Sequence, residues 1–106
     1  MNSTYIQIQS TFEKPEDAAK MANALLDARL VACCRTNEVA TFYDWKGERV
    51  NDREYLLTVN TRADMFEKCE KFIKERHPYE TPLIVAVEVK YGNAEYSAWV
   101  DRSIMI

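Results

Sequence analysis

Two prolines placed close together, Pro78 and Pro82, put a rigid corner near the C-terminal end of this chain. The segment His77-Pro78-Tyr79-Glu80-Thr81-Pro82 contains the only histidine of the sequence and two of its three prolines. Each proline disfavours the α region for the residue before it, so residues 77–82 are predicted to be extended and stiff. We call residues 77–82 the pivot. Its imidazole, phenol and carboxylate allow a functional site, but a corner of this kind can also serve only to aim one strand.

The chain before the pivot alternates between strand and helix patterns. Apolar residues recur with a period of two over Tyr5–Thr11, which predicts a half-buried strand. Helical spacing follows from Pro15 to about residue 29, with a proline suited to the first helical turn. Leu30–Cys34 leads into a second strand. Residues 36 to 60 are rich in β-forming side chains around Gly47, and therefore predict a long hairpin.

The segments on either side of the pivot predict a second helix and a last strand. Thr61 and Asp64 resemble a capping box, and an apolar stripe continues to Arg76, before Pro78 ends the helix. Leu83–Val89 is apolar enough on both faces to be an interior strand. Ala94–Arg102 is predicted to be a short third helix, with Asn93 as its cap.

The order β-α-β-β-α-β, with an extra helix at the end, predicts an α+β domain of the ferredoxin-like split βαβ type. Its four strands would form one antiparallel sheet with both crossover helices on one face. The other face would lack a cover, although the strands and pivot carry many aromatic and aliphatic side chains. A contiguous exposed patch of that kind usually marks an interface, so we expect the chain to associate with copies of itself.

Composition narrows the class of protein. The length of 106 residues fits a single domain over residues 1–106. A net charge of −3, from 17 acidic and 14 basic residues, argues against a nucleic-acid partner. No apolar run is long enough to span a bilayer, and Met1–Thr4 lacks the features of a signal peptide, so a cytoplasmic location is expected. Cys33, Cys34 and Cys69 form neither a disulfide framework nor a CxxC zinc motif.

Several strings together resemble the CutA divalent-cation tolerance family over nearly the whole chain, from about Tyr5 to Trp99. The strings that carry the resemblance are Leu30-Val31-Ala32-Cys33, Tyr43-Asp44-Trp45-Lys46-Gly47, Glu54, the pivot, and Tyr96 with Trp99. The resemblance implies a ferredoxin-like homotrimer that is cytoplasmic and linked to copper and other divalent metals, similar in plan to the PII signalling proteins. It implies no catalytic activity.

The resemblance also implies a metal position at the pivot. Some members bind copper through a cysteine near the end of the first strand and two adjacent histidines. Here those positions hold Ser10, Arg76 and His77, so only His77 matches. Imidazole is a good ligand for copper, so we predict that His77 binds Cu(II) or another divalent cation weakly. We expect no obligatory cofactor. The alternative is a corner histidine that bonds a backbone carbonyl.

The remaining candidate residues form a cleft or an interface. We expect this group to comprise Tyr43, Trp45, Glu54, Tyr55, Tyr79 and Glu80. Its aromatic members could line a small-molecule site between subunits or anchor the packing of a trimer. No nucleophile motif or phosphate-binding loop is present, so we do not expect an enzyme. The function predicted is copper and divalent-cation tolerance. The alternative is a PII-like module whose inter-subunit cleft holds a small ligand or an unidentified protein partner.

Overall fold

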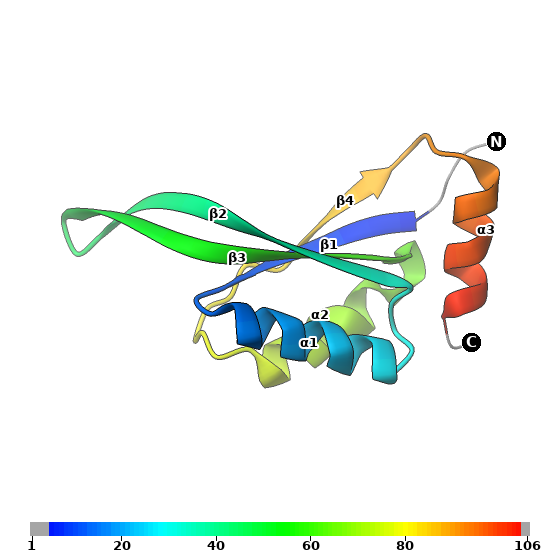
Figure 1. Cartoon of the computed structure of the whole chain (residues 1–106), viewed down its shortest axis with the longest axis horizontal. Coiled ribbons are helices and arrows are strands. Elements are labelled where there is room, and N and C mark those ends of the chain that lie inside the picture. Colours follow the sequence, from blue (N-terminus) through cyan, green and yellow to red (C-terminus); the bar gives the residue numbers. More distant parts are fainter. Residues whose placement is uncertain (1–4, 105–106) are drawn as a thin grey trace.

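The computed structural model describes residues 5–104, so the segment Met1–Thr4 considered above lies outside the described residues. Strands and helices alternate in the predicted order (Figure 1). The elements are β1 (Tyr5–Phe12), α1 (Pro15–Asp27), β2 (Cys33–Trp45), β3 (Glu48–Arg62), a 3-10 turn (Ala63–Met65), α2 (Phe66–Arg76), β4 (Val85–Val89) and α3 (Ala94–Ser103). None of the helices in this described part is long and apolar enough to cross a membrane.

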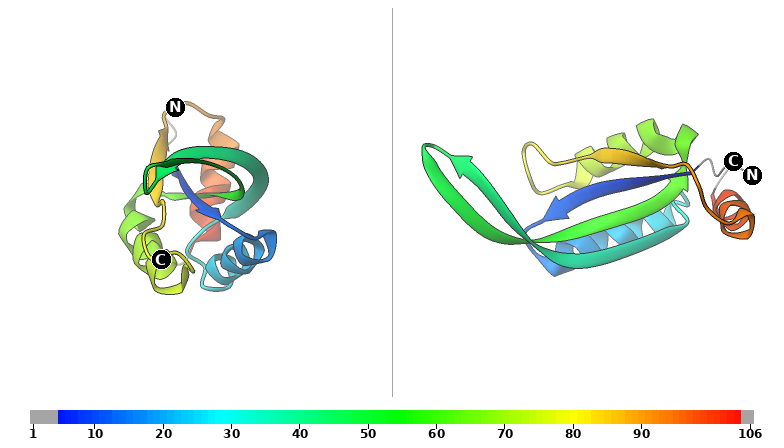
Figure 2. Two further views of the ribbon diagram at one scale, coloured as in Figure 1. Left: turned by 90° about the vertical axis from the view of Figure 1, so that its left-hand side faces the viewer. Right: turned by 90° about the horizontal axis from the view of Figure 1, so that it is seen from above.

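The four strands form one antiparallel sheet in the order β2-β3-β1-β4. This is the order of the split βαβ plan, and it confirms the predicted α+β ferredoxin-like fold. The helices α1 and α2 lie side by side against one face of the sheet (Figures 1 and 2). The core lies between them and the sheet, where Ile8 and Phe12 of β1 and Leu25 of α1 are at most 1% exposed.

The helix α1 begins as its sequence predicts and ends slightly earlier. Pro15 takes the first helical turn, and Met21 and Leu25 point into the core. Arg29 adopts a left-handed φ of 59°, which no helix can continue, and the N–H of Leu30 bonds back to the carbonyl of Leu25. The helix therefore ends at Asp27 and not near residue 29.

The predicted hairpin is present and longer than expected, because β2 and β3 pair from Cys33↔Asn60 to Trp45↔Glu48. Within residues 5–104, its outer part has no other strand beside it, since β1 reaches only Tyr55 of β3. We call this outer part, residues 39–54, the arm. It gives the chain a long axis of 47 Å and a radius of gyration of 14.6 Å, against about 13 Å for a compact domain of this size.

The strand β4 is not the interior strand that its composition predicts. Among the described strands it pairs with β1 alone, and it forms an edge of the sheet. Val85 and Val87 are 41% and 50% exposed. A strand that is apolar on both faces has the same sequence pattern whether its second face is covered by its own chain or by another molecule.

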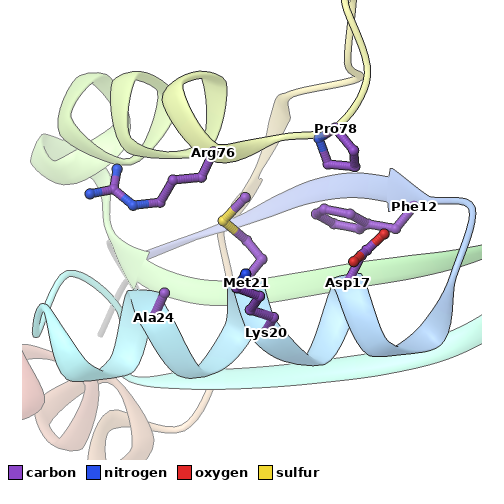
Figure 3. A pocket seen from close by; sticks show the side chains of 7 residues that line it. All are labelled: Phe12, Asp17, Lys20, Met21, Ala24, Arg76 and Pro78. Atoms are coloured by element: carbon purple, nitrogen blue, oxygen red, sulfur yellow. The ribbon is translucent and has the colours of Figure 1, made fainter.

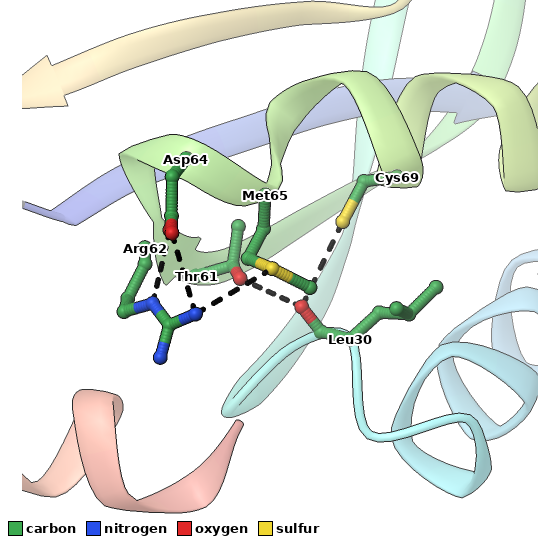
Figure 4. A network of polar contacts seen from close by, with 6 residues as sticks. All are labelled: Leu30, Thr61, Arg62, Asp64, Met65 and Cys69. Carbon is green, nitrogen blue, oxygen red and sulfur yellow. Dashed lines mark hydrogen bonds and ion pairs between the residues drawn. The ribbon is translucent and has the colours of Figure 1, made fainter. Parts of the chain in front are cut away.

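The predicted capping box at the start of the second helix is also wrong. Thr61 is fully buried, and its hydroxyl donates to the carbonyl of Leu30 at 2.6 Å (Figure 4). Asp64 instead pairs with Arg62 at 2.9 Å, and that guanidinium holds the pKa of the Asp64 carboxyl below its usual range. The Cys69 thiol donates to the same Leu30 carbonyl at 3.7 Å. The loop after α1, the end of β3 and α2 therefore meet at one carbonyl oxygen.

The helix α3 stands across one end of the sheet, where it contacts β3 (Figure 1). Its Tyr96 hydroxyl accepts a hydrogen bond from Asn60 Nδ2 at 2.8 Å, and its ring lies 5.7 Å from that of Tyr5. Asn93 stands at the N-cap position, but its side chain makes no capping hydrogen bond. Apart from these contacts, the sheet face opposite α1 and α2 has no cover within the described part of the chain.

Candidate functional site

The pivot begins at the end of α2. The N–H of His77 closes the last turn of that helix on the carbonyl of Ile73 at 2.8 Å. His77 itself is extended, with φ −73° and ψ 136°, as a residue before proline should be. The chain therefore leaves the helix at once, and the His77 side chain turns back under the sheet.

Both ring nitrogens of His77 are engaged inside the protein. Nε2 donates to the carbonyl of Thr11 at 2.9 Å, and Nδ1 accepts the backbone N–H of Tyr79 at 3.0 Å. A carbonyl can only accept and an amide can only donate, so the ring is the neutral tautomer with its proton on Nε2. Burial lowers the pKa of His77, outweighing the Thr11 carbonyl and the acidic side chains nearby, which raise it.

The described residues around His77 do not form a metal site within one chain. Ser10 is buried, with no hydrogen-bond partner for its hydroxyl among residues 5–104, and a neutral hydroxyl is a poor ligand for copper. Arg76 places its guanidinium over the Phe72 ring at 3.6 Å. The described residues contain no group of three or more His, Cys, Asp or Glu that could hold a metal ion. Metal binding by His77 stays a prediction, and it would require one of the ring's hydrogen bonds to break.

A cleft of about 800 Å³ lies between the pivot and the arm. It brings together five of the six residues predicted for a cleft or interface, which are Tyr43, Trp45, Glu54, Tyr79 and Glu80. Two hydrogen bonds order its wall: Tyr79 donates to Glu54 Oε2 at 2.8 Å, and Tyr43 donates to Asp52 Oδ2 at 3.0 Å. Burial and the Glu54 bond raise the pKa of Tyr79, which keeps its phenol protonated. The pivot is thus tied to β3 through Tyr79.

Tyr55, the sixth predicted residue, does not line the cleft. It lies opposite Phe12 in the strand pairing and packs against the core. Its side chain lies on the core side of β3, whereas the neighbouring Glu54 lines the cleft.

The cleft is strongly acidic, which the residues predicted from sequence only partly indicated. Glu13 and Asp52 join Glu54 and Glu80 in its lining. Its one lining cation, Arg53, pairs with Glu38 at 3.0 Å. The hairpin register could have identified Asp52 as a lining residue. A two-residue turn at Lys46-Gly47 pairs Asp52 with Thr41, and this places Asp52 on the same face as Tyr43. A cleft with this charge attracts cations.

The three thiols have different surroundings. Cys69 is fully buried, as its place on the helical stripe predicted, and burial raises its pKa to about 11. Cys34 donates to the carbonyl of Ala22 at 3.7 Å, and burial raises its pKa to about 12. Cys33 lies on the opposite face of β2. Two of the three are therefore neutral thiols at physiological pH, which makes them weak metal ligands.

Comparisons with known proteins agree on one family. Residues 6–103 match the family described as CutA1 divalent ion tolerance protein. The divalent-cation tolerance protein CutA of Thermus thermophilus is 40% identical, over 88% of this chain and 91% of its own length. That of Pyrococcus horikoshii is 37% identical, over 90% of this chain and 93% of its own length. The solved structure of a protein from Archaeoglobus fulgidus, titled a periplasmic divalent cation tolerance protein CutA, is 29% identical, with a TM-score of 0.91 over 95% of this chain and 99% of that one.

Proposed function

Because the chain belongs to the CutA1 divalent ion tolerance family, we propose that it works in divalent-cation tolerance as a homotrimer that binds copper. The observation that supports metal binding is the acidic cleft beside the pivot. Four carboxylates line this cleft, together with one cation that is already paired. The family favours this function over the PII-like alternative, in which the same cleft would hold a small organic ligand.

The arm and the edge strand support the trimer. An isolated two-stranded ribbon is marginally stable in water, yet the arm extends beyond β1 with Phe42 and Trp45 each more than 60% exposed. The strand β4 also exposes Val85 and Val87 at the edge of the sheet. We propose that neighbouring copies cover both surfaces, because edge strands and apolar ribbons that stay uncovered promote aggregation.

Assembly also bears on the metal. One chain lacks a ligand set among its described residues, so the proposed copper site draws on more than one copy. The candidate ligands are His77, if it leaves one of its hydrogen bonds, and the carboxylates of Glu54 and Glu80 at the cleft. Copper should bind more tightly than zinc, since first-row affinities for a given nitrogen and oxygen site peak at Cu(II).

Isothermal titration of the assembled protein tests the proposal. We expect Cu(II) to bind more tightly than Zn(II), and both His77→Ala and Glu80→Gln to weaken Cu(II) binding. Glu95→Gln is the matched control, because Glu95 is an exposed carboxylate in the first turn of α3, outside the cleft. Equal Cu(II) binding by wild type and both variants would show that neither the pivot nor the cleft contributes to copper binding. Binding of a nucleotide or organic acid, with none of copper, would favour the PII-like alternative.

The cytoplasmic location remains part of this proposal. The chain has three free cysteines, and reduced thiols persist in a reducing compartment. The Archaeoglobus protein is described as periplasmic, and that description applies to that protein. Fractionation of cells that produce the chain at its natural level decides between the two compartments.

A further inference from the structure

A second cavity, separate from the acidic cleft, lies between α1 and α2. Its volume is about 460 Å³, within the range of sites for small molecules. Apolar side chains from three segments line it, namely Phe12, Met21 and Pro78. Charged side chains also line it, and these are Asp17, Lys20 and Arg76.

The charges are separated along this cavity. Figure 3 shows the Asp17 carboxylate beside Phe12 and Pro78, while the Arg76 guanidinium lies on the other side of Met21. Neither Asp17 nor Lys20 forms an ion pair within the described part of the chain. The cavity therefore offers an anionic end, an apolar middle and a cationic end.

The walls of the cavity are fixed before any ligand arrives. The Phe12 ring is held by stacking on His77 at 4.2 Å, and Pro78 belongs to the stiff pivot. The Arg76 guanidinium is held over Phe72, and its Nη1 donates to the Phe72 carbonyl at 3.1 Å and pairs with the Glu75 carboxylate at 3.5 Å. In residues 5–104, its Nε and Nη2 donate no hydrogen bond, so one edge of the guanidinium remains available to a carboxylate.

We propose that this cavity binds a zwitterionic small molecule, an amino acid with an apolar side chain. Its ammonium group would pair with Asp17 and its carboxylate with Arg76. Its side chain would contact the exposed Pro78 and the half-buried Ala24. A metal ion would not use the apolar middle, and a simple anion would be repelled by Asp17. The site is independent of the proposed copper function, since none of its lining residues lines the acidic cleft.

The single histidine of the chain reports on this cavity without a label, because its ring stacks on the Phe12 wall. We would follow the His77 imidazole signals by NMR, and the heat of binding by calorimetry, during titration with L-leucine. L-leucinamide, which lacks the carboxylate, and N-acetyl-L-leucine, which lacks the ammonium, serve as comparisons. We expect saturable shifts with leucine and binding at least ~10-fold weaker for each blocked form, since each loses a charged hydrogen bond.

Variants assign the two ends of the ligand. Asp17→Asn and Arg76→Gln should each weaken leucine binding ~10-fold or more. Glu16→Gln and Lys74→Gln are the matched controls, since they remove the same charges from the same two helices outside the cavity, and they should leave binding unchanged. Circular dichroism verifies that each variant is folded. The proposal is overturned if leucine gives no saturable shift, if a blocked form binds as tightly as leucine, or if both Asp17→Asn and Arg76→Gln bind like wild type. None of these results would affect the copper proposal.

Discussion

The ring of Phe12 lies almost parallel to the imidazole of His77, with centroids 4.2 Å apart and planes inclined by 17°. Phe12 is the last residue of β1 and His77 is the first residue of the pivot, so this contact joins segments far apart in the sequence. With the Nε2 bond to Thr11, it fixes where the chain turns from α2 toward β4. The only histidine of the chain thus has a structural role in the described conformation.

This role predicts a pH-dependent stability. The pKa of His77 is lowered in the folded protein, while in the unfolded chain it should be near 6.5. The unfolded state therefore binds more protons in the window just below 6.5, and folding stability falls as pH decreases through that window. Above about 6.5 the contribution of His77 is fully present.

Urea unfolding at pH 7.5 and pH 5.5 measures this effect. Wild type should lose more stability between the two values than His77→Gln, which cannot titrate there. At pH 7.5, His77→Ala should cost about 2 kcal/mol or more, because it removes two buried hydrogen bonds and a ring contact. An equal pH dependence in wild type and His77→Gln would show that His77 is not held neutral.

A second prediction concerns the link between the pivot and the arm. Tyr79→Phe removes only the hydroxyl that donates to Glu54, and should cost about 1 kcal/mol of stability. Tyr43→Phe is the matched control, since it removes the more exposed bond to Asp52 and should cost less. Denaturant unfolding of both variants provides the comparison. A larger loss for Tyr43→Phe would place the main anchor of the arm at Asp52.

The thiols should react in an order set by burial. Cys69 is fully buried and its pKa is raised to about 11, so a thiol reagent should modify it only after unfolding. Cys33, whose side chain is partly exposed, should react first. Mass spectrometry of the protein, labelled with and without denaturant and then digested, measures each site. Rapid labelling of Cys69 in the folded protein would mean that α2 separates from the core.

The assembly prediction concerns Trp45. Light scattering should give about three times the chain mass of 12.4 kDa. Trp45→Ala should weaken the assembly by ~2 kcal/mol or more, as expected for an interface aromatic. Tyr91→Ala serves as the control, because Tyr91 is another highly exposed aromatic and lies outside the arm. A monomeric wild type would contradict the proposed trimer.

The sequence alone determined most of the helices and strands, because they depend on interactions between residues that are close together in the sequence. Alternation in Tyr5–Thr11, Pro15 at a helix start and Gly47 between two β-rich runs each act over a few residues, so the strand, the helix and the hairpin could be predicted directly. The strand order followed, because short connections and right-handed crossovers leave few topologies for β-α-β-β-α-β. Of the six residues predicted for a cleft or interface, five line one cleft and Tyr55 does not, and their function there stays a prediction.

Only the tertiary structure decided which partner each polar group takes. The Thr61 hydroxyl had a local partner available as a helix cap, yet it bonds to Leu30, 31 positions away. The Nε2 of His77 had metal and solvent as alternatives, yet it bonds to Thr11, 66 positions away. Sequence periodicity determines which face a side chain occupies, whereas a hydrogen bond between distant segments depends on how they pack. For the same reason β4 is apolar like an interior strand but lies at the edge of the sheet, because periodicity does not specify what covers a face.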